Sequence, residues 1–170
     1  MTAIEETAAA EAEKSTCDPI RAAGRATQAL TLPQLPYADA VVAELDAACM
    51  PPVAVEVGLR DTKPSHPELF MRFVWPVGSN LLDEGVQNRG LTIAWSHVTG
   101  WSAHPADEAP ELLNVDALAD PRAIAYAALE LAEQPLTGTW TPPTELLAGR
   151  WSSSVYLDIA LIHFEGREQR

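Results

Sequence analysis

The sequence has few cysteines, no long apolar run and no excess of basic residues, and each shortage excludes a class of protein. Its two cysteines, Cys17 and Cys49, are too few for a disulfide framework and predict a reducing compartment, with Cys49 a buried structural thiol. No stretch approaches the roughly 18 apolar residues of a spanning helix, and the first residues lack the basic and apolar parts of a secretory signal. We therefore expect a cytoplasmic protein.

Basic residues are outnumbered by acidic ones, 11 against 24, so that the formal net charge of the 170 residues is -13. Such a charge repels phosphate backbones and anionic lipid headgroups. We therefore expect neither nucleic acid nor a membrane as a partner. Hydrophobic residues make up 47% of the chain, which is enough for one domain with a core of its own.

Sequence motifs of catalysis and cofactor binding are also missing. The nine glycines are scattered singly and form no phosphate-binding loop, and no G-x-S-x-G elbow presents a nucleophilic serine. The sequence therefore predicts no cofactor and no metal, and it identifies no catalytic residue.

What the sequence does contain divides into three stretches. Residues 1 to 32 have hardly any large apolar side chain, which predicts a flexible N-terminal arm. Residues 33 to 136 carry helix and strand patterns and predict a domain of the α+β class. Residues 137 to 170 form a C-terminal extension.

The patterns within the domain predict an antiparallel sheet of about four strands packed against two or three helices. Strands are expected over residues 53 to 59, 68 to 75, 91 to 97 and 100 to 104, where apolar and polar residues alternate or apolar residues are dense. Helices are expected over residues 37 to 50 and 121 to 133 from their apolar spacing. Asp120 and Pro121 open the second helix, and Gly100 is expected to take a positive φ in a turn between strands. The segment SNLLDEGVQNRG, residues 79 to 90, is expected to be a long loop.

The tail segment VYLDIALIHF, residues 155 to 164, fits both regular periods. Val155, Leu157, Ile159 and Leu161 alternate as in a strand, whereas Val155, Ile159 and Ile162 form a helical stripe. The length and the preceding serines favour a helix. Because that helix would be apolar all round, we expect Leu157 and Leu161 to contact a protein partner, a second copy in a homodimer being the simplest candidate.

Two of the five tryptophans and two of the four histidines lie in LTIAWSHVTGWSAHP, residues 91 to 105. Trp95, like Trp75, is expected to fill the core. Trp101 follows the turn glycine beside polar Ser102 and His104, which predicts a position at a rim where it binds a partner.

His97 and His104 are the candidate metal-binding or catalytic pair, with Asp107 and Glu108 just beyond. Their odd offset places them on opposite faces of a strand unless the turn brings them together. The sequence thus favours a non-enzymatic, acidic protein-interaction module of a bacterial cytoplasm. The alternative is a small hydrolase or metal-dependent enzyme that uses His97 and His104.

Short motifs in the middle of the chain resemble those of a known family. They are an L-x-x-x-W strand followed by a GW step, and a D-P-x-x-I-A helix start, formed by Leu91, Trp95, Gly100, Trp101, Asp120, Pro121, Ile124 and Ala125. With the order of elements over roughly residues 36 to 134, they resemble an actinobacterial family of unknown function, the one numbered 6292. The resemblance implies a small cytoplasmic α+β domain without assigned chemistry or functional residues. The chain departs from the family pattern in residues 79 to 90 and in its apolar tail.

Overall fold

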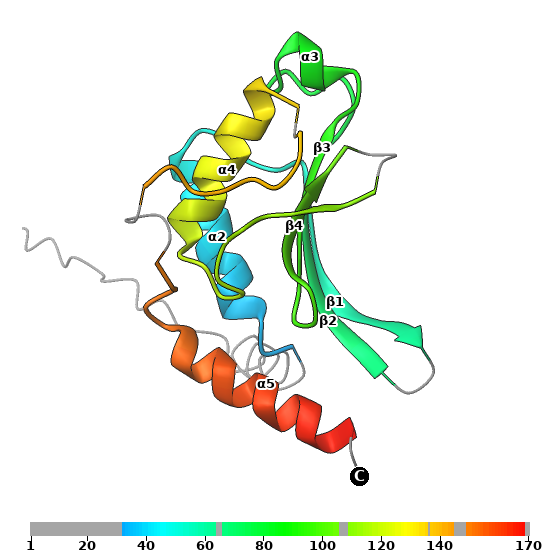
Figure 1. Ribbon diagram of the computed structural model, residues 1–170, viewed down its shortest axis with the longest axis vertical. Coiled ribbons are helices and arrows are strands. Elements are labelled where there is room, and N and C mark those ends of the chain that lie inside the picture. The colour runs from blue at the N-terminus through cyan, green and yellow to red at the C-terminus, as the bar shows by residue number, and fades with distance from the viewer. Residues whose placement is uncertain (1–31, 64–65, 106–108, 136, 145–148, 169–170) are drawn as a thin grey trace, which may run out of the picture.

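The computed structural model has an α+β fold in which helices lie on one side of an antiparallel sheet (Figure 1). It describes residues 32–63, 66–105, 109–135, 137–144 and 149–168. The predicted class is confirmed, with five strands instead of about four and with four helices among the described residues. Apart from Leu32, which packs against the core, the predicted flexible arm lies outside this part of the chain.

The sheet is a meander in which each strand is antiparallel to the next along the chain. Its strands are β1 (Ala54–Lys63), β2 (His66–Trp75), β3 (Leu91–Ser96), β4 (Gly100–His104) and β5 (Glu111–Leu112). The first four correspond to the predicted strands. β1 and β2 extend beyond the predicted strands, because their pairing continues past an irregularity in register between Asp61 and Lys63. Gly100 has the expected positive φ, 75°.

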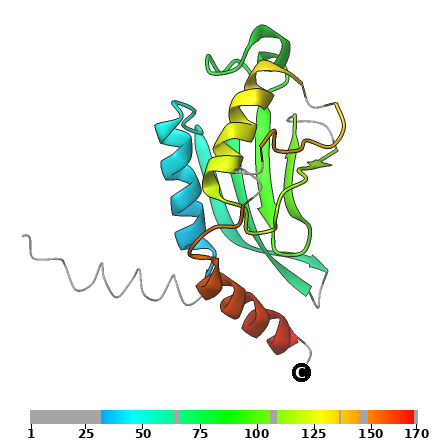
Figure 2. The ribbon, with the colours of Figure 1, turned by 60° about the vertical axis from the view of Figure 1, so that its left-hand side comes forward.

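Alternating side chains give the sheet two different faces. One face is buried under the helices and carries Leu69, Met71, Phe73, Trp75, Ile93, Trp95, Trp101 and Ala103. Trp75 and Trp95 are thus core residues, as predicted. The other face carries residues such as Arg72, Ala94 and Ser102, and Figure 2 shows it turned away from the helices. We call this the open face.

Helices α2 (Leu35–Ala47) and α4 (Pro121–Glu133) lie side by side on the sheet (Figures 1 and 2). Each buries one stripe of residues at helical spacing, which includes Tyr37, Val41 and Leu45 on α2. Asp120 caps α4 as predicted, since its side chain accepts a hydrogen bond from the Arg122 amide.

Helix α2 ends three residues before the predicted end, residue 50, in a Schellman turn. The Met50 amide donates to the Leu45 carbonyl at 2.9 Å, and the Cys49 amide donates to the Asp46 carbonyl at 3.0 Å. Cys49 occupies the left-handed position of this turn, with a φ of 59°. The turn buries Met50 and leaves Cys49 exposed, so the prediction of a buried thiol at Cys49 is wrong.

Two further helices complete the described structure. The short helix α3 (Glu84–Gln87) lies in the segment expected to be a loop. Helix α5 (Ser154–Glu168) shows that the tail adopts the favoured helical period.

The segment before α5 is fastened to the domain by backbone hydrogen bonds. The Trp151 amide donates to the Leu118 carbonyl at 2.8 Å, and the Asp120 amide donates to the Gly149 carbonyl at 2.9 Å. Trp140 is 8% exposed and belongs to the same core. Trp140, Gly149 and Trp151, which belong to the predicted C-terminal extension, therefore pack with the domain.

Candidate functional site

The two histidines of the alternative enzyme lie at opposite ends of the β3–β4 hairpin. The register pairs Thr92 with His104 and Ser96 with Gly100, so His97 follows the far end of β3. Five residues of extended chain separate the two positions, which corresponds to roughly 16 Å along the sheet. His104 shares a face of β4 with Ser102, whereas His97 lies in the turn that follows β3. The turn does not bring the two imidazoles together.

Both histidines make local structural contacts. His97 Nδ1 accepts a hydrogen bond from the Leu69 amide at 3.1 Å, and the ring meets Phe164 of α5 edge to face at 5.4 Å. His104 Nδ1 lies 2.7 Å from the Pro105 carbonyl oxygen. No group of three or more His, Cys, Asp or Glu side chains able to hold a metal occurs among the described residues, which do not include Asp107 and Glu108.

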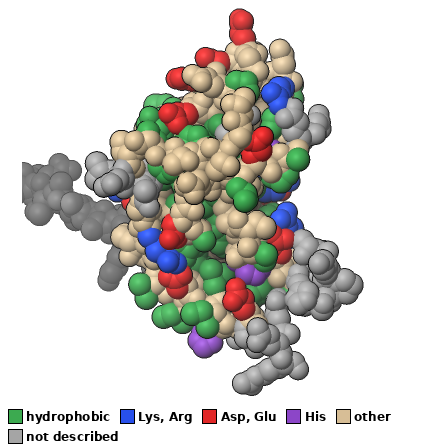
Figure 3. Space-filling view, viewed as in Figure 1, with side chains coloured by type: hydrophobic (Ala, Val, Ile, Leu, Met, Phe, Trp, Pro, Cys, Tyr) green, Lys and Arg blue, Asp and Glu red, His purple; other side chains and the backbone are tan. Residues whose placement is uncertain are grey.

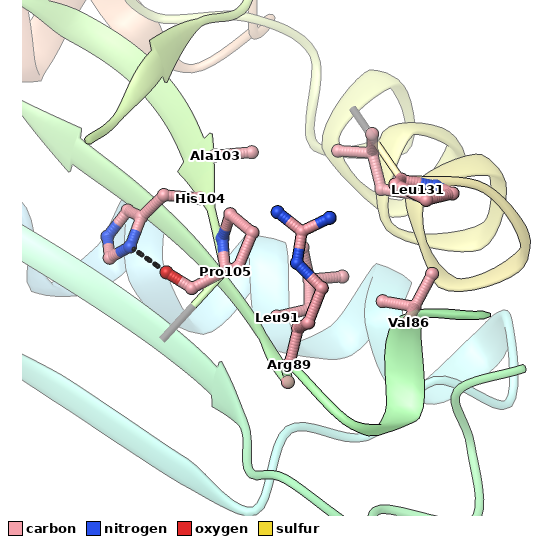
Figure 4. Close-up of a pocket in the computed structure, with 9 residues that line it drawn as sticks. Val86, Arg89, Leu91, Ala103, His104, Pro105 and Leu131 are labelled. Atoms are coloured by element: carbon pink, nitrogen blue, oxygen red, sulfur yellow. Dashed lines mark hydrogen bonds between the residues drawn. The ribbon is translucent and has the colours of Figure 1, made fainter. Parts of the chain in front are cut away.

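A small cavity lies beside His104, between β4 and α4 (Figure 4). Its volume is about 20 Å³, which is room for a single water molecule. Figure 4 shows the Arg89 side chain between Pro105 and Leu131, while the His104 imidazole points toward the Pro105 carbonyl. This cavity is too small to hold a substrate.

A larger hollow of about 300 Å³ lies on the open face of the sheet. Its charged side chains are held in cross-strand pairs. Arg60 Nη2 and Nε donate to the two carboxylate oxygens of Glu68 at 2.9 and 3.0 Å, and Arg72 Nη1 donates to Glu56 at 3.1 Å. The Arg60 guanidinium also lies over the Phe70 ring, 5.3 Å from its centroid. The opposite charges of this surface therefore neutralise one another.

Glu68 is the buried member of these pairs, with 6% of the residue exposed. The hydrogen bonds from Arg60 lower the pKa of this carboxyl, although burial acts in the opposite direction. The Ser96 hydroxyl oxygen accepts from the Val98 amide at 3.0 Å and thereby closes the β3–β4 turn. These polar groups hold strands and a turn together, which is a structural role.

The prediction that Trp101 lies at a rim is wrong. The residue is 1% exposed, and its indole Nε1 donates to the Tyr37 hydroxyl at 3.2 Å. Trp101 pairs with Trp95 across the hairpin and faces the helices with it. Its polar neighbours Ser102 and His104 mark the opposite face of β4, not a rim. A side chain in this position does not reach a partner.

Tyr37 is the centre of the aromatic part of the core. Its hydroxyl donates to the Ala119 carbonyl at 2.6 Å and accepts from Trp101, and its ring stacks on Trp151 at 4.8 Å. Burial raises the pKa of this phenol well above its ordinary value, so the hydroxyl stays a neutral donor. Tyr37 thereby joins α2 to the hairpin and to the segment that leads into α5.

One side of α5 packs on the domain. Leu157 is 1% exposed, and Leu161 and Phe164 are partly buried against the core. These residues are four and seven positions apart and therefore share a side of the helix. The prediction that Leu157 contacts a partner is wrong, because its own domain covers it, and Leu161 points to the same side.

The other side of α5 is apolar as well, and it is uncovered. Val155, Tyr156, Ile159 and Ile162 are 67%, 57%, 52% and 68% exposed. Their spacing of one, four and seven residues places them together, and we call this surface the outward face of α5. Figure 3 shows hydrophobic side chains gathered at the lower end of the molecule, where α5 lies. Three of these residues, Val155, Ile159 and Ile162, form the helical stripe of the sequence, whereas the predicted partner contacts, Leu157 and Leu161, lie on the opposite side.

Comparisons with known proteins give no family and no relative. No family model matches the chain, and no curated protein or solved structure is found to match it. The resemblance to the family numbered 6292 therefore stays a prediction. None of the helices in the described ranges is long and apolar enough to cross a membrane.

Proposed function

We propose that this chain is a non-enzymatic, acidic protein-interaction module of a bacterial cytoplasm, and that it binds a protein partner through the outward face of α5. One observation carries the proposal: four apolar side chains, each at least half exposed, share one side of a helix whose other side is already packed. Single exposed apolar residues are common on protein surfaces, but a group on one helix face is typical of an interface.

The surface favours a partner of particular chemistry. A helix with an exposed apolar stripe fits into an apolar groove. Since the chain carries a formal net charge of -13, a groove with a basic rim would be attracted at long range, whereas an acidic protein would be repelled. His163 and Glu165 are exposed beside the outward face of α5 and would lie next to the rim of the partner's groove.

The test compares two variants with the wild-type chain as bait in the lysate of its native host, followed by mass spectrometry. The double variant Ile159→Asp with Ile162→Asp places charges on the outward face of α5. Val98→Asp is the matched control, because Val98 is 69% exposed but lies in the β3–β4 turn. Circular dichroism shows that each bait is folded.

We expect a protein that the wild type and Val98→Asp retain in comparable amounts and that the α5 double variant loses. The proposal fails if all three baits retain the same proteins, or if the wild type retains none. Metal analysis of the purified chain addresses the alternative function. Stoichiometric zinc would favour the metal-dependent enzyme over the interaction module.

A further inference from the structure

Strand β1 is an edge of the sheet that is long enough to pair with another strand. It spans ten residues and pairs with β2 on one side, while the described residues place no strand on its other side. Proteins commonly protect such edges with short strands, prolines or bulges. The opposite edge strand, β5, has two residues. By contrast, the seven residues from Ala54 to Arg60 contain no proline and precede the irregularity in register.

The helices cover β1 only in part: the Gln34 side chain before α2 donates to the Gly58 carbonyl at 2.9 Å, and Val57 is partly buried against the core. Val55 is 42% exposed and Leu59 49% exposed on the face that carries the core. Their neighbours across the ladder on β2, Phe73 and Leu69, are fully buried. On the open face, the Glu56 and Arg60 side chains are 51% and 49% exposed, so there is space beside β1 for one more strand.

The backbone of β1 also presents donors at this edge. The His97 amide donates to the Leu69 carbonyl, so the odd-numbered residues of β2 bond toward β3 and the even-numbered ones toward β1. The partners of those even-numbered residues on β1 are Ala54, Glu56, Gly58 and Arg60. The amides of Val55, Val57 and Leu59 consequently point away from the sheet.

We propose that a second copy of this chain pairs with β1 in the antiparallel direction, about a two-fold axis at Gly58, and so joins the two sheets into one. The order of charges on β1 identifies the occupant. Glu56 and Arg60 lie on the open face, two residues to either side of Gly58. The two-fold axis places Glu56 of each copy opposite Arg60 of the other.

This pairing extends the charge pairs already present in each copy. Glu56 is bonded to Arg72, and Arg60 is bonded to Glu68. Across the joined sheet the row therefore alternates in sign: Arg72, Glu56, then Arg60 and Glu68 of the second copy. A parallel pairing in register would instead place Glu56 beside Glu56 and Arg60 beside Arg60, which is unfavourable.

The side chains on the core face of β1 are also compatible with the two-fold axis at Gly58. Val57 comes to lie opposite Leu59 of the second copy, so the half-exposed Leu59 side chains become buried. Gly58 has no side chain to collide with its counterpart at the axis. The dimer would present two outward faces of α5, which increases the avidity for a partner with two grooves. The inference itself does not depend on what α5 binds.

Sedimentation and light scattering of the full chain test the pairing, in about 0.15 M salt to screen the repulsion between two acidic chains. At about 100 μM, an interface with a Kd near 10 μM is mostly assembled. Leu59→Lys introduces a charge that the monomer leaves in solvent and the dimer buries. Val98→Lys is the matched control at an exposed apolar site away from β1. We expect a dimer for the wild type and the control, and at least tenfold weaker association for Leu59→Lys.

Hydrogen exchange of the wild-type chain gives a second readout that needs no variant. The amides of Val55, Val57 and Leu59 should exchange fast in dilute solution and at least tenfold more slowly as the concentration rises through the Kd. A wild-type monomer at 100 μM overturns the inference, as do edge amides whose exchange is independent of concentration. A dimer that survives Leu59→Lys but is lost in Ile159→Asp with Ile162→Asp would place the second copy on α5 instead.

Discussion

Removing one oxygen atom from the core should test the aromatic cluster directly. Tyr37→Phe keeps the stacked ring but deletes the hydroxyl that donates to the Ala119 carbonyl and accepts from Trp101 Nε1. Tyr37 and Ala119 are 0% exposed and Trp101 is 1% exposed, so water cannot replace the lost partner. The variant therefore leaves one buried acceptor and one buried donor without hydrogen bonds.

The expected cost follows from those two groups. An unsatisfied buried polar group costs about 1 to 3 kcal/mol. Because phenylalanine is more easily buried than tyrosine, we expect a net loss of about 2 to 4 kcal/mol in the free energy of unfolding. With a urea m-value of about 2 kcal/mol/M, the midpoint should fall by about 1 to 2 M. Such a loss is a large part of the stability of an ordinary domain.

Urea unfolding followed by tryptophan fluorescence and by far-UV circular dichroism measures this loss. Tyr156→Phe is the matched control, since Tyr156 is 57% exposed, and its free energy of unfolding should lie within about 0.5 kcal/mol of the wild-type value. The raised pKa of Tyr37 adds a pH dependence: the contribution of its hydroxyl is fully present below the unfolded-state pKa of about 10 and is lost above it. The difference between wild type and Tyr37→Phe should therefore narrow above pH 10. Equal midpoints for the two variants at neutral pH would refute this reasoning.

Four further variants test other parts of the structure. Cys49→Gly should raise the free energy of unfolding by about 0.5 to 1 kcal/mol in urea, because glycine adopts the left-handed position without strain; a loss would contradict the Schellman turn. Leu157→Ala should cost about 2 to 4 kcal/mol in thermal unfolding and Ile159→Ala less than about 1 kcal/mol, and equal losses would mean that α5 is not docked by Leu157. Glu68→Gln tests the ion pair with Arg60, which lowers the pKa of Glu68. The ionised carboxylate therefore adds to the free energy of unfolding above its unfolded-state pKa of about 4.3, and this stabilisation is lost as the pH falls below that value. The stability gap to the wild type should therefore close in acid, and a gap that widens would contradict the Arg60 pairing.

The strands of the sheet could be predicted because period-two alternation is a local signal. The same alternation also predicts the face on which Trp101 lies. In a strand, polar residues at adjacent positions describe the opposite face, so Ser102 and His104 favoured burial of Trp101 once β4 was accepted. The predicted rim position was wrong because residues adjacent in a strand are not neighbours on one face. β5 was missed because two residues are too few for any period to be visible.

The packing of α5 could not be predicted from the sequence, because both sides of the helix are apolar. Periodicity shows that Leu157 and Ile159 lie on different sides, but it does not show which side the domain covers. That choice depends on Trp151, which stacks on Tyr37, and on the backbone bonds between residues 118–120 and 149–151. These contacts join residues more than a hundred positions apart or lie in irregular segments without a pattern of their own.

The order in which the elements follow one another matters during synthesis, because α5 comes after all the elements on which it packs. Domains assemble from the N-terminal side as translation proceeds, and exposed apolar surface on an unfinished chain promotes aggregation. In this protein, α2, the meander and α4 are all made before the two-sided apolar helix leaves the ribosome. The surface that receives Leu157 can therefore form before Leu157 is released from the ribosome. Once the helix has packed, only its outward face remains exposed as apolar surface.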